Sequence, residues 1–182
     1  MRFFRTYPTA LLLMMAVTIA GCSTSTTKSV DVSTTIRKSL DDAGFRDVKV
    51  AQNLEKGVVT LSGSADSEAN KLLAEKLAKG LAGEQVVANE IAVLPRGAEA
   101  DAKAINKNVD TGIEKNFEAA LIANKMKDGI KFTVKNSVVT LSGEVNSQAL
   151  RADVERVAMG VPYVKQVVNE LQVKNQKASS SN

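Results

Sequence analysis

Residues 58–63 have the sequence Val-Val-Thr-Leu-Ser-Gly, and the same six residues recur at 138–143, 80 positions later. Aligned without a gap, residues 58–93 and 138–173 share about 15 identities in 36 positions. A repeat of about 65 residues is long enough to fold as a small domain, unlike the shorter unit of a solenoid. The sequence therefore predicts two tandem copies of one domain, at 29–94 and at 109–174.

Each copy shows the same alternation of helical and strand patterns. Val32, Ile36 and Leu40 recur every four residues, as on one face of a helix. The following stretches predict two strands joined by a turn, then a helix, then a last strand. In the first copy the expected ranges are 48–50 (strand), 53–57 (turn), 58–61 (strand), 67–80 (helix) and 85–93 (strand). In the second copy they are 130–134 (strand), 135–137 (turn), 138–141 (strand), 147–160 (helix) and 165–173 (strand).

The order of elements is αββαβ, which predicts an α+β fold: two tandem domains, each a small mixed three-stranded sheet with two helices on one face. Ser29 and Asp110 are the expected N-caps of the first helix in each copy. Gly63 and Gly143 are interpreted as structural glycines where a strand passes into the next helix.

The remaining segments are interpreted as connections. Residues 95–108 are rich in alanine and charge and are expected to form a linker that is partly helical over 101–107. Residues 175–182 are polar and are expected to form a disordered tail.

The first 21 residues have the pattern of a secretory signal. Arg2 and Arg5 precede an apolar run over 9–20, which is too short for a membrane-spanning helix of about 20 residues. The run ends in Ile-Ala-Gly-Cys at 19–22, which resembles the lipobox of bacterial lipoproteins. The alternative is an ordinary secretory signal with an incidental cysteine.

The lipobox resemblance implies that residues 1–21 are removed and that Cys22 carries the acyl chains, such as palmitate, that anchor the protein. Residues 22–28 would then form a flexible tether of at most roughly 27 Å, which keeps the first domain close to the bilayer. Ser23, in the position after the cysteine, favours the outer membrane facing the periplasm in the lipoproteins that this segment resembles.

The charge balance argues against a nucleic-acid partner. The chain has 24 lysines and arginines against 20 acidic residues, and loss of Arg2 and Arg5 with the signal leaves a net charge of about +2. So small an excess does not indicate a nucleic-acid surface, and an exported protein does not meet DNA. Cys22 is the only cysteine, so disulfides cannot supply stability, which must come from the two cores.

At this point a family can be named. The αββαβ order, the Val-x-Leu-x-Gly string and the ending Val-x-Asn-Glu-[Ile/Leu]-x-Val at 87–93 and 167–173 resemble the BON domain family of bacterial proteins. The resemblance covers nearly the whole chain after the signal, twice. It implies a dual BON-domain lipoprotein that binds phospholipid or membrane and supports outer-membrane integrity or tolerance of osmotic stress.

Catalytic chemistry is not expected. The sequence has no histidine, which excludes Ser-His-Asp and Cys-His catalytic sites and histidine metal sites, and it has no P-loop or dinucleotide-binding pattern. The acidic pairs Asp41 with Asp42 and Glu68 with Glu75 alternate with lysines and are interpreted as solvated surface. We therefore expect no enzyme activity, no cofactor and no metal site.

The dipeptide Asn-Glu recurs at 89–90 and 169–170, which suggests a shared role. Side chains alternate across a strand, so Asn89 shares one face with Val87 and Ile91, whereas Glu90 shares the other with Ala88. A polar side chain on an apolar face needs a hydrogen-bond partner. A structural role is therefore favoured for Asn89 over a binding role.

Two segments of the second domain are candidates for lipid contact. Ile122 lies near Lys115, Lys125 and Lys127, and basic residues beside an apolar one suit an anionic bilayer surface. Ile122 aligns with Asp41, so core packing does not explain it. The second candidate is Tyr163, in an apolar loop at 161–163.

Two functions remain open. The first is a non-enzymatic lipoprotein whose domains bind anionic phospholipid. The alternative is a periplasmic protein-interaction or chaperone-like module that takes an envelope protein as partner. Unpaired strand edges offer a physical route for that partner, by strand addition.

Overall fold

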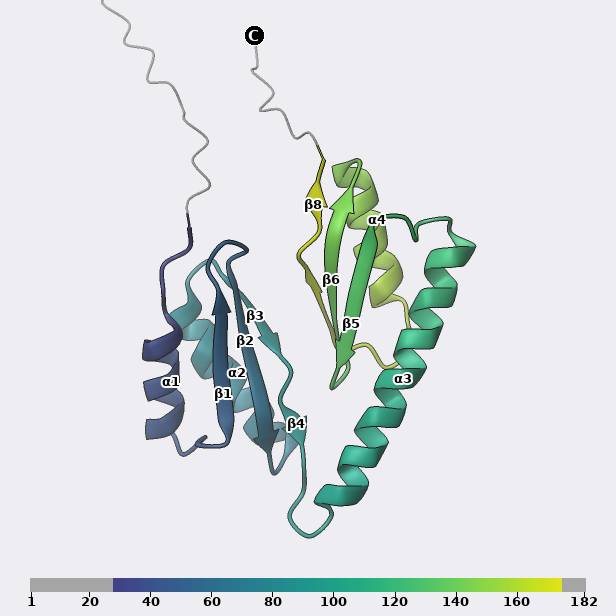
Figure 1. Cartoon of the computed structure of the whole chain (residues 1–182). Coiled ribbons are helices and arrows are strands. Elements are labelled where there is room, and N and C mark those ends of the chain that lie inside the picture. Colours follow the sequence, from purple (N-terminus) through teal and green to yellow (C-terminus); the bar gives the residue numbers. More distant parts are fainter. Residues whose placement is uncertain (1–27, 175–182) are drawn as a thin grey trace, which may run out of the picture.

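The computed structural model describes residues 28–174, which form two units with the same order of elements (Figure 1). The expected signal at 1–21, the lipidation site Cys22, most of the tether and the tail at 175–182 lie outside the described residues.

The first domain is a mixed sheet covered on one face by two helices (Figure 1). The central strand β2 pairs antiparallel with β1 and parallel with both β3 and β4, so the last two strands form one interrupted edge. Its elements are α1 (Ser33–Asp42), β1 (Val48–Asn53), β2 (Val58–Ala65), α2 (Glu68–Ala82), β3 (Val86–Asn89) and β4 (Ala92–Val93).

The second domain repeats this arrangement with the same register. Strand β6 pairs antiparallel with β5 and parallel with β7 and β8. The expectation of two αββαβ domains, each with a three-stranded mixed sheet and two helices, is thereby confirmed. The elements are α3 (Glu99–Ala123), β5 (Ile130–Lys135), β6 (Val138–Val145), α4 (Gln148–Met159), β7 (Gln166–Asn169) and β8 (Gln172–Val173).

Each domain has its own core between the sheet and the helices. Ile36 and Leu40 of α1 are fully buried in the first core, together with Val59 and Leu61 of β2. In the second core the buried Phe117 meets Phe132 edge to face, with ring centroids 4.8 Å apart. Aromatic pairs favour this geometry, which adds to the burial of apolar area.

The second helix of each domain begins where the sequence predicts. Ser67 and Ser147 are the N-caps, and their hydroxyl oxygens accept hydrogen bonds from the amides of Asn70 at 3.2 Å and Leu150 at 3.1 Å. The helix α2 continues through Gly80 to Ala82, so it is longer than expected.

The expected N-caps of the first helices are wrong. Helix α1 begins at Ser33, with Val32 in the N-cap position, so Ser29 lies outside it. Helix α3 begins at Glu99, so Asp110 lies inside the helix and most of the expected linker is helical. The alanines over 98–104 explain the extension, because alanine is the strongest helix former.

Gly63 and Gly143 lie inside strands β2 and β6, and not at their ends as expected. Their φ angles are +102° and +110°, a region that side chains other than glycine rarely enter. A Cβ at either position would overlap a backbone carbonyl oxygen of the neighbouring segment, that of Asp47 or of Gly129. These glycines therefore allow the close approach of the chain that leads into β1 or β5.

The sheet faces that the helices leave uncovered meet between the domains. Val58 and Val138, which are sequence-equivalent, form one buried cluster with Ala88 and Val168, which are also sequence-equivalent. Equivalent residues meet in this way when two copies are related by an approximate twofold axis.

Candidate functional site

The repeated asparagine joins the last strand of each domain to its second helix. The amide nitrogen Nδ2 of Asn89 donates to the carbonyl of Lys71 at 3.3 Å and to Glu75 Oε2 at 2.9 Å, and Asn89 Oδ1 accepts from the amide of Ile91 at 3.3 Å. Asn169 makes the same three bonds, at 3.2, 2.8 and 3.2 Å, with Arg151, Glu155 and Leu171. Each asparagine therefore stabilises the break between the two short strands at that edge of its sheet, which are β3 and β4 in the first domain and β7 and β8 in the second.

The same contacts affect the pKa of Glu75, the carboxylate of α2 that Asn89 contacts. Burial opposes the charged form of Glu75, but hydrogen bonds from Lys79 and Asn89 outweigh it and hold the pKa of Glu75 below its ordinary value. A charged acceptor strengthens the bond from Asn89. Asn89 is accordingly a structural residue in this geometry, and it faces the core side of the sheet.

The repeated glutamate faces the other domain. Lys56, in the β1–β2 hairpin, pairs with Glu170 at 2.6 Å. In the reverse direction, Lys135 at the β5–β6 hairpin pairs with Glu90 at 3.1 Å, and Asn136 Nδ2 donates to the Glu90 carbonyl at 2.8 Å. Each hairpin therefore contacts the end of the third strand in the opposite copy.

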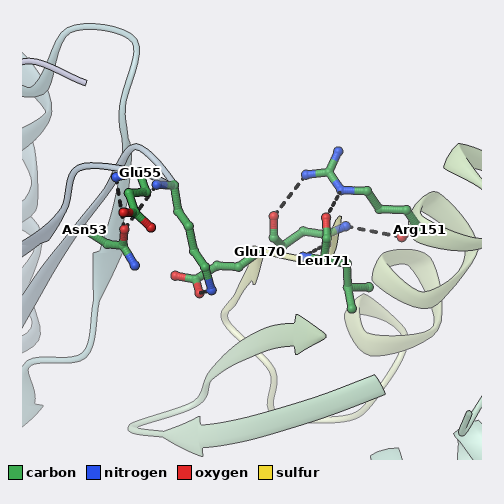
Figure 2. A network of polar contacts seen from close by, with 7 residues as sticks. Asn53, Glu55, Arg151, Glu170 and Leu171 are labelled. Carbon is green, nitrogen blue, oxygen red and sulfur yellow. Dashed lines mark hydrogen bonds and ion pairs between the residues drawn. The ribbon is translucent and has the colours of Figure 1, made fainter. Parts of the chain in front are cut away.

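Figure 2 shows how these contacts join into one network across the junction. Asn53 Oδ1 accepts from the backbone amides of Glu55 and Lys56 at 3.1 Å, which orders the hairpin turn beside Glu170. On the far side, Arg151 donates to the carbonyls of Asn169 and Leu171, each at 3.0 Å. The network links the turn of the first domain to α4 of the second.

A glutamine side chain covers the outer edge of β3. Gln166 Nε2 donates to the carbonyl of Val87 at 2.7 Å, and Gln166 Oε1 accepts from the amide of Asn89 at 3.0 Å. The carboxamide thus takes the place of a peptide group from a neighbouring strand. Strand addition at this part of β3 would have to displace Gln166.

The structure brings three of the candidate lipid-contact residues to one end of α3. The side chain of Ile122 is 56% exposed, and Lys125 and Lys127 follow directly after the helix. Lys115 lies two turns earlier on the same face, about 10 Å along the helix axis. Lys127 is paired with Glu118 at 2.6 Å, so its charge is largely compensated within the protein.

The other candidate lies elsewhere. Tyr163 is 77% exposed, with a positive φ of 70°, in the loop that follows α4. That loop is beside the β5–β6 turn, because the amide of Lys165 donates to the Ser137 carbonyl at 2.9 Å. Ile122 lies near the opposite end of β5, which is about 17 Å away. The two candidates therefore do not form one surface.

The acidic residues that lie in pairs in the sequence form ion pairs with basic residues in the structure. Asp41 pairs with Arg37 at 2.5 Å and Asp42 pairs with Lys38 at 2.8 Å, both one turn apart on α1. Over residues 28–174, no group of three or more metal-binding side chains is present. The helices of this part of the chain are also too short or too polar to cross a membrane.

One residue that sequence reasoning missed lies at the junction. Lys71 of α2 is only 5% exposed, and burial lowers its pKa below the ordinary value. In the sequence it is one of several lysines on a helix with many polar residues, which is typical of a solvated face. Lys165 and Gln166 of the second domain line the same cavity.

Comparison with known proteins agrees with this architecture. The model of the BON domain family matches residues 29–95 and 109–175. The chain is 31% identical to the osmotically-inducible protein Y of Escherichia coli (strain K12) over 137 residues, which cover 74% of this chain and 67% of that protein.

Two solved structures of CdsD, a structural protein of the type III secretion system of Chlamydia trachomatis, are also similar at 12% identity. The first covers 80% of this chain and 98% of its own, with a TM-score of 0.32. The second covers 79% of this chain and 92% of its own, with a TM-score of 0.35. Scores this low carry no conclusion about function. The two matched segments coincide with the two αββαβ units, and the chain belongs to the BON domain family.

Proposed function

We propose that this chain is a non-enzymatic lipoprotein of the bacterial envelope, anchored through Cys22, whose second BON domain contacts anionic phospholipid through Ile122, Lys115, Lys125 and Lys127. It would sit in the outer membrane, face the periplasm and support tolerance of osmotic stress, as the name of the related osmotically-inducible protein Y suggests. No cofactor is required for this role.

The observation that carries the proposal is where the N-terminal end of the described chain lies relative to the C-terminal end of α3. The described chain starts at residue 28, beside the β1–β2 hairpin, where the amide of Ser29 donates to the Leu54 carbonyl at 2.8 Å. The C-terminal end of α3 lies at the same end of the molecule (top of Figure 1). A tether from Cys22 would therefore bring Ile122 toward the bilayer.

The residues at the C-terminal end of α3 suit shallow contact with a bilayer surface. Ile122 is a large apolar side chain with no role in the core, and Lys125 adds a charge for which the described residues provide no ion pair. Each lysine near an anionic surface contributes about 1 kcal/mol, so a few such residues strengthen an attachment that the acyl chains already provide.

The test is co-sedimentation of the mature chain from Ser23 onward with vesicles of phosphatidylglycerol or of phosphatidylcholine alone. The mature chain should bind the anionic vesicles only. Ile122→Asp, which places in the second domain the residue found at the equivalent Asp41, should weaken this binding about fivefold or more. Tyr163→Gly is the matched control, and it should bind as the unaltered chain does.

Equal binding to both vesicle types, or loss of binding in Tyr163→Gly and not in Ile122→Asp, would contradict the proposed surface. For the alternative of a protein-interaction module, a partner that adds a strand at β3 would compete with Gln166, which occupies that edge. A partner that adds a strand would have available the edge of β5, and the edge of β1 beyond Val48, whose carbonyl accepts from the Arg37 guanidinium.

A further inference from the structure

A cavity of about 320 Å³ lies between the two domains, next to α2 and the start of β7. Three lysines and two glutamates line it: Lys71, Lys79, Lys165, Glu68 and Glu75. The loop before β7 lies at the turn end of the β5–β6 hairpin, so the cavity is remote from the end that carries Ile122.

Lys71 is the most buried charged residue that lines this cavity. The residue is 95% buried, yet within residues 28–174 its Nζ makes neither a hydrogen bond nor an ion pair within 4.0 Å. The stem of the side chain is therefore buried, whereas its ammonium group reaches the solvent of the cavity and is free to bind an anion there.

The glutamates of the cavity are already occupied. Glu68 pairs with Lys165 at 3.0 Å, and Glu75 pairs with Lys79 at 2.5 Å. Glu75 also accepts the 2.9 Å bond from Asn89. These pairs use two of the three lysines, which leaves Lys71 without an ion pair of its own.

Asp110 is the other carboxylate whose charge reaches Lys71. Its oxygens are occupied too, since they accept from the backbone amides of Asn136 and Ser137 at 2.8 Å. Every carboxylate close enough to influence Lys71 is therefore committed to another donor.

The second domain supplies an internal comparison. The equivalent of Lys71 is Arg151, 80 positions later, and its guanidinium donates to the carbonyls of Asn169 and Leu171 at 3.0 Å. The donors of Arg151 are thus used within the fold. The ammonium group of Lys71 makes no such bonds and remains available at the cavity.

We propose that this cavity binds a singly charged oxyanion, a carboxylate or a phosphodiester, with Lys71 Nζ as its main donor. The charge count favours no more than one negative charge, because the three lysines and two glutamates that line the cavity leave a net charge of +1, which the nearby Asp110 reduces further. A doubly charged phosphate would be repelled by Glu68 and Glu75. The site is separate from the proposed lipid surface and does not depend on it.

The test uses the full chain in a nonionic detergent, with ¹⁵N-labelled lysine side chains, titrated at constant ionic strength. Acetate and dimethyl phosphate are the probes for the two sources of a singly charged oxyanion, and inorganic phosphate at alkaline pH is the doubly charged comparison. The Lys71 signal should shift saturably with acetate or with dimethyl phosphate, and the one that binds more tightly identifies the source. Inorganic phosphate should bind more weakly than both.

Two variants separate binding from folding. Lys71→Met should weaken binding about tenfold or more, since a hydrogen bond to a charged group contributes at least that much. Lys71→Arg keeps the charge, but its guanidinium should bond to strand carbonyls as Arg151 does, and anion binding should also fall. Lys76→Met, an exposed lysine of the same helix, is the control and should leave binding unchanged.

The proposal is overturned if neither singly charged probe gives a saturable shift at Lys71. It is also overturned if a folded Lys71→Met or Lys71→Arg chain binds as tightly as the unaltered one. Tighter binding of the doubly charged phosphate would contradict the charge assignment.

Discussion

Lys56 of the first domain and Glu170 of the second form an ion pair of 2.6 Å, although they are 114 positions apart in the chain. Its counterpart joins Lys135 to Glu90 across the same junction. The glutamates are mostly buried, with side chains 14% and 15% exposed, so these pairs are better shielded from water than ordinary surface pairs. Together they hold the two domains in one orientation.

The double variant Glu90→Gln with Glu170→Gln should therefore loosen the junction more than it destabilises either domain. We expect a loss of about 1 kcal/mol in unfolding free energy and more independent tumbling of the two domains. ¹⁵N relaxation measured separately for each domain checks this. Glu84→Gln, at an exposed site, should leave tumbling unchanged, and unchanged tumbling in the double variant would mean that the ion pairs do not hold the junction.

Asn89 should contribute to the stability of the first domain through its three hydrogen bonds. Asn89→Ala removes the partner of buried backbone groups and of Glu75, and should lower the unfolding free energy by about 2 kcal/mol in urea denaturation. Asn169→Ala should act similarly in the second domain. Asn116→Ala on the exposed face of α3 should be neutral or slightly stabilising, because alanine favours the helix. A neutral effect at Asn89 would argue against its structural role.

Gly63 and Gly143 should not tolerate a side chain. Alanine at either site would combine the positive φ with overlap of a carbonyl oxygen, and should lower the unfolding free energy by about 2 kcal/mol or more. Gly80→Ala is the matched comparison, since Gly80 lies in a helix with open space around it. That variant should stabilise the chain by about 0.5–1 kcal/mol, measured by thermal or urea unfolding.

Lys71→Met should stabilise the protein at neutral pH, by about 1 kcal/mol, because burial of the side chain disfavours the charged form of Lys71. The folded state lowers the pKa of Lys71, so folding is disfavoured while the lysine is protonated. As pH rises through the lowered pKa toward the ordinary value of 10.5, the unaltered chain regains stability and the advantage of the variant should shrink. Urea unfolding at a series of pH values measures this, and an advantage that grows with pH would contradict it.

The sequence was sufficient for the fold within each copy, because the cues there are local. Alternation over 48–50 and 130–134, the helix face of Ile36 and Leu40, and the cap at Ser67 all lie close to the elements that they determine. The N-cap at Asp110 was predicted wrongly because the alanines before it extend the helix, and no breaker residue stands between them.

The junction could not be predicted in the same way. Alternation placed Glu90 on the face away from the core, but nothing local in the sequence identifies Lys135 as its partner. Lys71 has the pattern of a solvated lysine in the sequence, and only the folded structure places Lys165 and Gln166 at the same cavity. Contacts between copies depend on how the domains pack, and the repeat reveals only that both carry the same Asn-Glu.

The central claim is that the end of the second domain near Ile122 contacts anionic lipid, and NMR titration of the mature chain from Ser23 tests it most directly. Micelles containing phosphatidylglycerol should shift signals of residues 115–127 and leave Tyr163 unaffected, and purely zwitterionic micelles should shift neither. Shifts confined to the Tyr163 loop, equal shifts with both micelles, or no shifts at all would contradict the account.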